Sequence, residues 1–232
     1  MDMSAKEHAA RFALSYVEND MILGLGSGST AEMFIEYLGA AVADGLRVRG
    51  VPTSRQSEQV AITFGVPLIE VEQVDHIHLT IDGADEVGPE FALIKGGGGC
   101  LLREKIIANA SDLMICIVDE SKLVEVLGEY PLPVEVDKFG FTITAKKIFD
   151  VLAKASGNNP EIRQRMKKGS DKPFITDGGN YIFDCECSVL PRAREIAKQL
   201  SVVPGVVEHG LFIDMARVVI VGTETGADVL EI

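Results

Sequence analysis

Apolar residues in the first part of the chain follow two spacings that alternate. Within residues 9–17 they stand three or four positions apart, which is the spacing of one face of a helix. A continuous apolar run at 21–23 leads into a loop with three glycines, and helical spacing resumes over 33–41. The pattern predicts a helix, a buried strand, a tight loop and a second helix.

The alternation continues as far as residue 118. Strands are predicted at 46–51, 77–81 and 113–118, and helices at 54–64 and 100–110. The last of these strands is apolar throughout, as expected for a strand buried on both faces of a sheet. Strands that alternate with helices favour a mostly parallel sheet with right-handed crossovers, so we assign the chain to the α/β class.

The pattern changes at Pro131, where two prolines interrupt it. A polar stretch at 156–172 then separates a helix predicted at 146–155 from a strand predicted at 181–185. We interpret this region as a second, smaller α+β domain. Two further strand candidates, at 211–213 and 217–221, are expected to return the chain to the first sheet.

The predicted domain organisation is therefore discontinuous. Residues 1–130 and 208–232 are expected to form the larger domain, and residues 131–207 the smaller one. The sequence contains no internal repeat and no low-complexity tract that would favour a repeat architecture or a long linker.

Composition and charge narrow the class of protein. Of the 232 residues, 47% are hydrophobic and 25% charged, which is typical of a packed globular protein. No apolar run reaches the roughly 20 residues of a membrane helix, and the first residues lack the features of a signal peptide, so we expect a cytoplasmic protein. The net charge of −13, without a basic cluster, argues against a nucleic-acid partner.

Cysteine usage agrees with that location. The four cysteines form no CxxC pair and are too few for a disulfide framework, so reduced thiols are expected.

The loop at residues 24–30 is the first candidate site. Glycines there let the backbone turn tightly into a helix, whose first N–H groups can bind an anion, and Ser27, Ser29 and Thr30 add hydroxyl groups. This chemistry suits a phosphate monoester. A tight turn with Ser29 or Thr30 as the helix N-cap explains the same residues equally well. The dinucleotide-binding, P-loop and nucleophile-elbow motifs all fit the loop poorly.

Two aspartates follow the strand at 77–81. Asp82 and Asp85 are expected at its carboxyl end, where open α/β sheets bind ligands. Carboxylates in that place can hold sugar hydroxyls, transfer protons or bind Mg²⁺. The alternative is an ordinary turn, since aspartate and glycine are common turn residues.

A lysine, four glycines and a glutamate follow. Four consecutive glycines lose much conformational entropy on folding, which favours close approach to a ligand over a linker. Lys95 can stabilise an oxygen that becomes negative during a reaction, and Glu104, on the following helix, is a candidate general base. Taken alone, Glu104 is also compatible with a solvated helix position.

Other polar residues are weaker candidates. Lys122 follows the strand at 113–118 and is expected at its carboxyl end, although single lysines usually lie on the surface. His76 and His78 share one face of a strand, but no third ligand stands at a metal-site spacing. We assign no metal site.

Several motifs together carry a resemblance to a known family. In chain order they are Gly26 to Thr30, Asp82 to Glu86, Lys95 to Gly98, Arg103 to Ile107, Ser121–Lys122, Pro131 to Val136, Pro204 to Val207 and Gly210 to Phe212. In this order they resemble ribose-5-phosphate isomerase of the A type, and the resemblance runs through most of the chain. A Rossmann-like core with a small α+β domain is the fold that it implies.

The resemblance also implies a reaction. Members of this family interconvert D-ribose 5-phosphate and D-ribulose 5-phosphate in the pentose phosphate pathway without a metal or organic cofactor. By analogy Glu104 moves a proton between C1 and C2 through a cis-enediolate, assisted by Asp82, Asp85 and Lys95. A homo-oligomer, dimer or tetramer, is expected.

The substrate contacts implied by the resemblance come from three segments and one further lysine. They are Ser27, Gly28, Ser29, Thr30, Asp82, Gly83, Ala84, Asp85, Lys95, Gly96, Gly97, Gly98 and Lys122. The chain departs from the family pattern at Gly99–Cys100 and at Gly178, neither of which is a proposed catalytic group.

Related sheets occur in proteins with other functions, so fold analogy does not fix the reaction. A sugar-phosphate-binding regulatory module would need the anion loop but no general base at Glu104. A coenzyme A transferase-like enzyme would form a thioester on a glutamate.

Overall fold

The computed structural model describes residues 3–232 and divides into two compact units. The first contains the chain up to Ala84, Arg103–Leu123 and Asp214–Ile232, and the second contains Asp85–Leu102 and Val124–Ile213. The boundaries differ from those predicted at residues 130 and 207. The chain already enters the second unit at Asp85, because two short strands after this residue pair with each other and the second of them pairs with a strand near residue 211.

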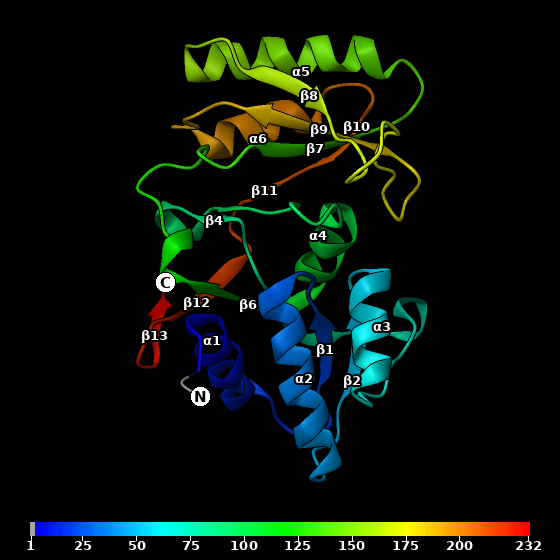
Figure 1. Cartoon of the computed structure of the whole chain (residues 1–232), viewed down its shortest axis with the longest axis vertical. Coiled ribbons are helices and arrows are strands. Elements are labelled where there is room, and N and C mark those ends of the chain that lie inside the picture. Colours follow the sequence, from blue (N-terminus) through cyan, green and yellow to red (C-terminus); the bar gives the residue numbers. More distant parts are fainter. Residues whose placement is uncertain (1–2) are drawn as a thin grey trace. The chain divides into compact units, whose positions relative to one another are not determined.

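The helices and strands are as follows (Figure 1). The α-helices are α1 (Ala5–Ala13), α2 (Ser29–Ala43), α3 (Arg55–Thr63), α4 (Leu101–Asn109), α5 (Phe141–Ser156) and α6 (Ala193–Ser201). The 3₁₀ helices are η1 (Leu14–Tyr16), η2 (Val71–Gln73), η3 (Pro89–Phe91) and η4 (Glu120–Lys122). The strands are β1 (Ile22–Leu25), β2 (Arg49–Pro52), β3 (Ile77–Asp82), β4 (Glu86–Val87), β5 (Leu93–Ile94), β6 (Ser111–Asp119), β7 (Leu132–Val136), β8 (Glu161–Gln164), β9 (Tyr181–Glu186), β10 (Val206–His209), β11 (Leu211–Phe212), β12 (Ala216–Gly222) and β13 (Ala227–Glu231).

The first unit is built on a six-stranded sheet in the order β13-β12-β6-β3-β1-β2. All neighbouring pairs are parallel except β12 and β13. The prediction of an α/β fold with a mostly parallel sheet is confirmed. Of the two strands expected to return to this sheet, the one at 217–221 does so as β12, which lies beside β6. The expectation for 211–213 is wrong, because Leu211 and Phe212 form β11, which pairs with β5 in the second unit.

Apolar side chains of the sheet and helices form the core of the first unit. The main cluster packs Phe34, Ile35 and Leu38 of α2 against sheet residues such as Ile81 and Ile117. These three helix positions are spaced by one, three and four, so one face of α2 is buried against the sheet. The spacing of apolar residues that predicted this helix therefore reflects the face of α2 that packs against the sheet.

The second unit contains two antiparallel sheets. One has four strands in the order β10-β7-β9-β8, and the other has three in the order β11-β5-β4. Helices α5 and α6 pack against the four-stranded sheet through Ile148, Leu152, Ile196 and Leu200 (Figure 1). Strand β8 is an edge strand of this sheet and lies within the polar stretch for which no strand was predicted.

Candidate functional site

The anion loop of the first unit ends at the N-terminus of α2. Gly28 is the N-cap, with a φ of 95°, and no side chain caps the helix. The alternative that Ser29 or Thr30 acts as N-cap is therefore wrong, because both already lie in the first turn. Their N–H groups belong to the first turn of a helix, which has no carbonyl partners within the helix and can bind an anion.

Asp82 fixes the start of this loop from the neighbouring strand. It is buried at the end of β3, and its Oδ1 accepts hydrogen bonds from the N–H groups of Ser27, at 3.0 Å, and Gly83, at 2.7 Å. The backbone of Gly26 also donates to the carbonyl of Ile81, at 3.0 Å. The first two sequence motifs are thus in contact within one unit.

The approach of the two strands leaves no room for a side chain at Gly26. A Cβ atom built there would lie 2.5 Å from the Cα of Asp82 and closer still to its carboxylate. Only glycine fits at this position, because any side chain would clash with Asp82.

Two residues next to the loop were missed by the sequence analysis. The hydroxyl of Ser27 donates to Oγ of Ser54, at 2.7 Å, and lies 2.9 Å from Oγ1 of Thr53. Thr53 and Ser54 directly follow β2, which pairs in parallel with β1. The rule that located Asp82 at a strand end would have located them too.

Glu104 lies in the first turn of α4 and is only 4% exposed. The interpretation as a solvated helix residue is therefore wrong. Lys105 beside it is also buried. Charged side chains are rarely this buried unless they are paired or have a chemical role. Lys122 lies half-buried in η4, directly after β6.

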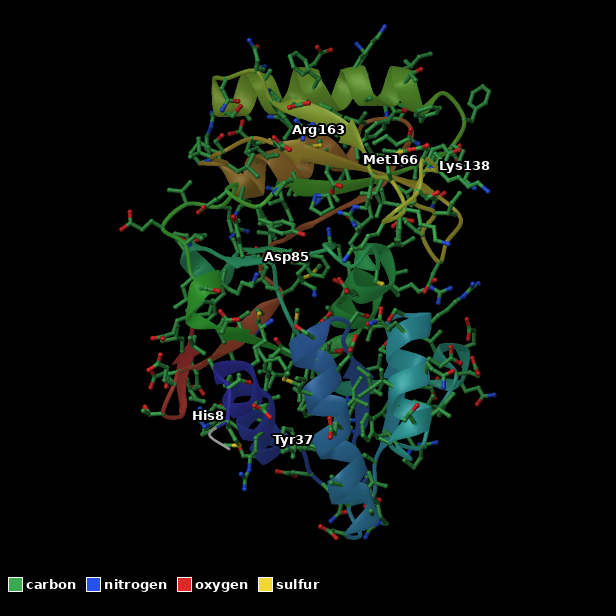
Figure 2. The ribbon with its side chains drawn as sticks, viewed as in Figure 1. His8, Tyr37, Asp85, Lys138, Arg163 and Met166 are labelled. Carbon is green, nitrogen blue, oxygen red and sulfur yellow. The ribbon has the colours of Figure 1, made fainter. Side chains whose placement is uncertain are left out.

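A second group of candidate residues lies in the second unit. Asp85, labelled in Figure 2, accepts a hydrogen bond at Oδ2 from the N–H of Gly97, at 2.8 Å. Lys95 is buried, its N–H donates to the carbonyl of Gly210, at 2.9 Å, and its Nζ lies 5.4 Å from the ring centroid of Phe212. The lysine is therefore held by its backbone and contacts an aromatic ring.

The glycine run after Lys95 is ordered by its neighbours. Gly96 and Gly99 have φ angles of 103° and 82°, in the left-handed region that favours glycine. A Cβ at Gly97 would lie 2.6 Å from Oδ1 of Asp85 and closer still to the hydroxyl of Tyr130. Gly98 alone of the four is exposed, and a Cβ there would meet no atom within 4 Å. Internal packing explains three of the glycines and leaves Gly98 available for a ligand.

Tyr130 and Arg165 complete this second group, and sequence analysis assigned neither. Burial raises the pKa of Tyr130, the charge of Asp85 raises it further, and Arg165 partly opposes the effect. The Tyr130 backbone is anchored to the buried carboxylate of Glu86, which also accepts from the N–H of Gly128, at 2.7 Å. No local sequence signal marks these residues, because their partners are distant along the chain.

His76 and His78 each contact another group of the protein. His76 pairs with Asp112, at 2.7 Å, and His78 accepts at Nδ1 from the N–H of Ile22, at 3.0 Å. In residues 3–232, no group of three or more His, Cys, Asp or Glu side chains could hold a metal ion. Over the same residues, no helix has both the length and the apolar character needed to cross a membrane.

Comparison with known proteins identifies the family. The family model for ribose 5-phosphate isomerase A (phosphoriboisomerase A) matches residues 49–226. The chain belongs to the ribose 5-phosphate isomerase A family. It is 58% identical over 227 residues to a ribose-5-phosphate isomerase A of Maricaulis maris, covering 98% of this chain and 97% of the relative. A ribose-5-phosphate isomerase A of Nitrobacter hamburgensis is 49% identical, with 97% of each chain covered.

Solved structures of ribose 5-phosphate isomerases agree with this membership. A D-ribose-5-phosphate isomerase in complex with phospho-erythronic acid is 40% identical, with a TM-score of 0.91 and 98% of both chains covered. The ribose 5-phosphate isomerase A of Methanocaldococcus jannaschii is 36% identical, with a TM-score of 0.89 and 98% of both chains covered. The chain is therefore an isomerase, and neither a regulatory module nor a coenzyme A transferase-like enzyme is favoured.

Proposed function

We propose that this enzyme interconverts D-ribose 5-phosphate and D-ribulose 5-phosphate in the non-oxidative branch of the pentose phosphate pathway. The match to isomerases over nearly the whole chain supports the substrate. The observation that carries the mechanism is the burial of Glu104 within the first turn of α4. Glu104 lies on a helix that carries one of the motifs of this family. A carboxylate shielded from water in this place is suited to proton transfer at carbon.

The proposed reaction moves one proton between two carbons. In the open-chain aldose, the Glu104 carboxylate removes the proton from C2, and the C1–C2 bond becomes double while O1 takes the negative charge. Glu104 returns the proton to C1, the carbonyl forms at C2, and a proton passes from O2 to O1. No atom or electron is gained or lost overall, so the reaction needs no oxidant or reductant, and we propose that Lys95 rather than a metal ion stabilises the enediolate charge.

Three further residues are proposed to assist. Lys95 supplies positive charge to the enediolate oxygen, as expected for a preorganised cation at a site of developing charge. Asp82 and Asp85 take part in ring opening and in the proton transfer between O1 and O2. Their observed hydrogen bonds to the N–H groups of Ser27 and Gly97 support these roles, since they fix the direction of each carboxylate.

The substrate is proposed to be held by the remaining residues of the predicted set. Ser27, Gly28, Ser29 and Thr30 are assigned to the phosphate together with Lys122, because helix N–H groups and hydroxyls suit a phosphate monoester. Gly83, Ala84, Gly96, Gly97 and Gly98 are assigned to backbone contacts with the sugar. We also propose that phospho-erythronic acid binds here, because its carboxylate resembles the charged end of an enediolate.

The finer statements about assembly and location belong to the same proposal. We propose a cytoplasmic homo-oligomer, either a dimer or a tetramer. Large exposed apolar side chains in the second unit support an interface, with Phe139 at 92% and Ile143 at 67% exposure. Sedimentation of the purified chain would give the number of subunits.

Replacement of Glu104 by Gln tests the mechanism. We expect kcat to fall by about 10²- to 10⁴-fold, the range lost with a general base, because the amide cannot accept the proton. Binding of phospho-erythronic acid, measured by calorimetry, should be retained within a few-fold. Glu36→Gln, at an exposed position of α2, is the matched control and should leave turnover unchanged.

Two results would contradict the proposal. Turnover of ribose 5-phosphate by Glu104→Gln at the parent rate would exclude this residue as the base. Loss of activity in EDTA that returns with a divalent cation would show that the charge is stabilised by a metal rather than by Lys95.

A further inference from the structure

The segment from Lys95 to Gly98 is held on two sides within the second unit. On one side, Asp85 accepts the N–H of Gly97. On the other, the guanidinium of Arg165 donates from Nη1 to the carbonyl oxygens of Gly96, at 2.9 Å, and Gly97, at 3.1 Å. Asp85 and Arg165 therefore hold the peptide group between Gly96 and Gly97 at its N–H and at its carbonyl oxygen, and Arg165 also holds the carbonyl oxygen of the next peptide group.

Arg165 is itself firmly fixed. Its Nε and Nη2 donate to the two carboxylate oxygens of Asp184, at 2.9 Å and 2.5 Å, in a bidentate pair. Its side chain is 13% exposed. Its backbone N–H donates to the carbonyl of Ile182, at 2.8 Å, and its carbonyl accepts from the N–H of Phe174, at 2.9 Å. The backbone of Arg165 is therefore anchored to Ile182 of β9 and to Phe174, and its guanidinium is anchored to Asp184 of β9.

The surroundings keep the guanidinium charged and in place. Burial opposes the charge on Arg165, but the hydrogen bonds and charge of Asp184 offset it, and the pKa of Arg165 lies above its ordinary value. Phe174 lies with its ring centroid 5.9 Å from Cζ of Arg165, and the same ring would collide with a Cβ at Gly99. Since Asp184 balances its charge, Arg165 acts on the glycine run through geometry.

Peptide planarity connects these contacts to the ligand side of the run. The carbonyl of one residue and the N–H of the next belong to one rigid plane and point in opposite directions in a trans peptide. Fixing the carbonyl of Gly97 therefore fixes the direction of the N–H of Gly98, the exposed glycine of the run. Fixing the carbonyl of Gly96 does the same for the N–H that binds Asp85.

We propose that Arg165 is a positioning residue, which orients the peptide groups of Gly96 and Gly97 and so places Lys95 and the Gly98 N–H for the isomerase reaction. The inference rests on the proposed function, because it assigns Arg165 to a segment proposed to contact substrate. Arg165 itself touches no reacting atom. Its planar fork reaches two carbonyls and a carboxylate at once, which a lysine cannot do.

Replacement of Arg165 in the full-length chain tests the proposal. For Arg165→Ala we expect kcat/KM for ribose 5-phosphate to fall by about 10- to 100-fold, mainly in kcat, because small misplacements at a site cost rates of this order. Millimolar guanidinium chloride, far below denaturing concentrations, should restore part of kcat in this variant and raise none in the parent. Arg165→Lys should also lose kcat, although the charge beside Asp184 is kept.

A matched control lies two residues before Arg165, on β8. Arg163, labelled in Figure 2, is exposed and pairs with Glu161 and Glu186 at the surface. Arg163→Ala should keep kcat and KM within about twofold of the parent, as expected when no interaction in the transition state is removed. Asp184→Asn should lower kcat less than Arg165→Ala, and the double variant should be no worse than Arg165→Ala alone.

The outcomes separate this inference from the function that it builds on. A folded Arg165→Ala with kcat and KM of the parent overturns the inference. If this variant does not fold at the assay temperature, a folded Arg165→Lys decides, and full activity there overturns it as well. If the parent enzyme does not turn over ribose 5-phosphate, the proposed function fails, and if Lys95→Ala leaves turnover unchanged, only the role proposed for Lys95 fails. If Lys95→Ala lowers turnover but Arg165→Ala keeps the kcat and KM of the parent, only the inference about Arg165 is overturned and the proposed function stands.

Discussion

Two glycine loops of this chain are held in different ways. The loop at 24–28 lies between β1 and α2, and its shape follows from the parallel sheet and from Asp82 on the neighbouring strand. The run at 96–99 follows β5, and it is held by side chains, chiefly Asp85 and Arg165. The first loop is thus part of the framework, and the second is secured by contacts that individual substitutions can remove.

The difference predicts how stability and activity are coupled. At the first loop, a change that disturbs the geometry must also disturb the sheet, so stability and activity should fall together. At the second, side chains can give way while the strands remain paired. Substitutions at the second loop should therefore lower activity more than they lower the free energy of unfolding.

Gly26→Ala is expected to have the largest effect. The added methyl group would meet the Cα and carboxylate of Asp82, and backbone cannot move aside without shifting β3. We expect the free energy of unfolding to fall by about 3 kcal/mol, near the upper end for overpacking, together with most of the activity. Urea unfolding and turnover would measure both, and Gly226→Ala, where a methyl group meets open space, is the control. A Gly26→Ala variant that is inactive but as stable as the parent would contradict the expectation that stability and activity fall together at the first loop.

Gly97→Ala should separate the two quantities. Its methyl group would meet the hydroxyl of Tyr130 and Oδ1 of Asp85, which are ends of side chains. We expect a loss of about 1 kcal/mol or less in stability but about 100-fold in kcat/KM, because the run must shift to make room. Gly98→Ala sharpens the test, since it leaves stability unchanged and raises KM only if a ligand approaches there. Equal losses of stability in Gly26→Ala and Gly97→Ala would contradict the distinction.

The smallest expected effect concerns pH and the second loop. Burial, with a contribution from Asp85, raises the pKa of Tyr130 in the folded chain. The folded state therefore retains the phenol proton more strongly, and this contribution to stability is complete below the unfolded pKa, near 10, and lost as pH rises through the folded value. Stability above pH 10 should fall less steeply in Tyr130→Phe than in the parent. The difference in absorbance between the two proteins during an alkaline titration reports the ionisation of this phenol. If the free energy of unfolding falls equally steeply with pH in both proteins, the effect is excluded.

The sequence predicted the first unit well for a physical reason. Its strands β1, β3 and β6 are short apolar runs, and helix α2 has one buried apolar face, so each leaves a clear pattern in the sequence. The functional candidates Asp82 and Ser27 stand at the ends of such elements. Their meeting follows from the rule that parallel strands end at one edge of a sheet.

The second unit was less predictable. Strand β7 begins Leu132–Pro133, and a proline inside a strand weakens the prediction. Strand β8 alternates exposed and half-buried residues, which gives little apolar contrast. Helix α6 was also missed, although Ile196 and Leu200 stand four positions apart on one face.

The same limit applies to the candidate site. Lys95 and Gly97 were found because a lysine before four glycines is unusual in a packed domain. Arg165 was not found, because its contacts depend on a pairing of β8 with β9 that no local pattern reveals. Side chains that act on distant backbone leave no periodic trace in the sequence.

The order of strands in the first sheet has a consequence for folding during synthesis. Strand β12 pairs with β6, Ala216 with Met114, although the whole larger segment of the second unit lies between them in the chain. Chains are made from the N-terminus, so β12 and β13 leave the ribosome last of the strands described here. Until then one edge of β6 offers an unpaired row of backbone groups to other chains. The nascent protein should therefore depend on chaperones late in its synthesis, when the Val124–Ile213 segment is already free to fold.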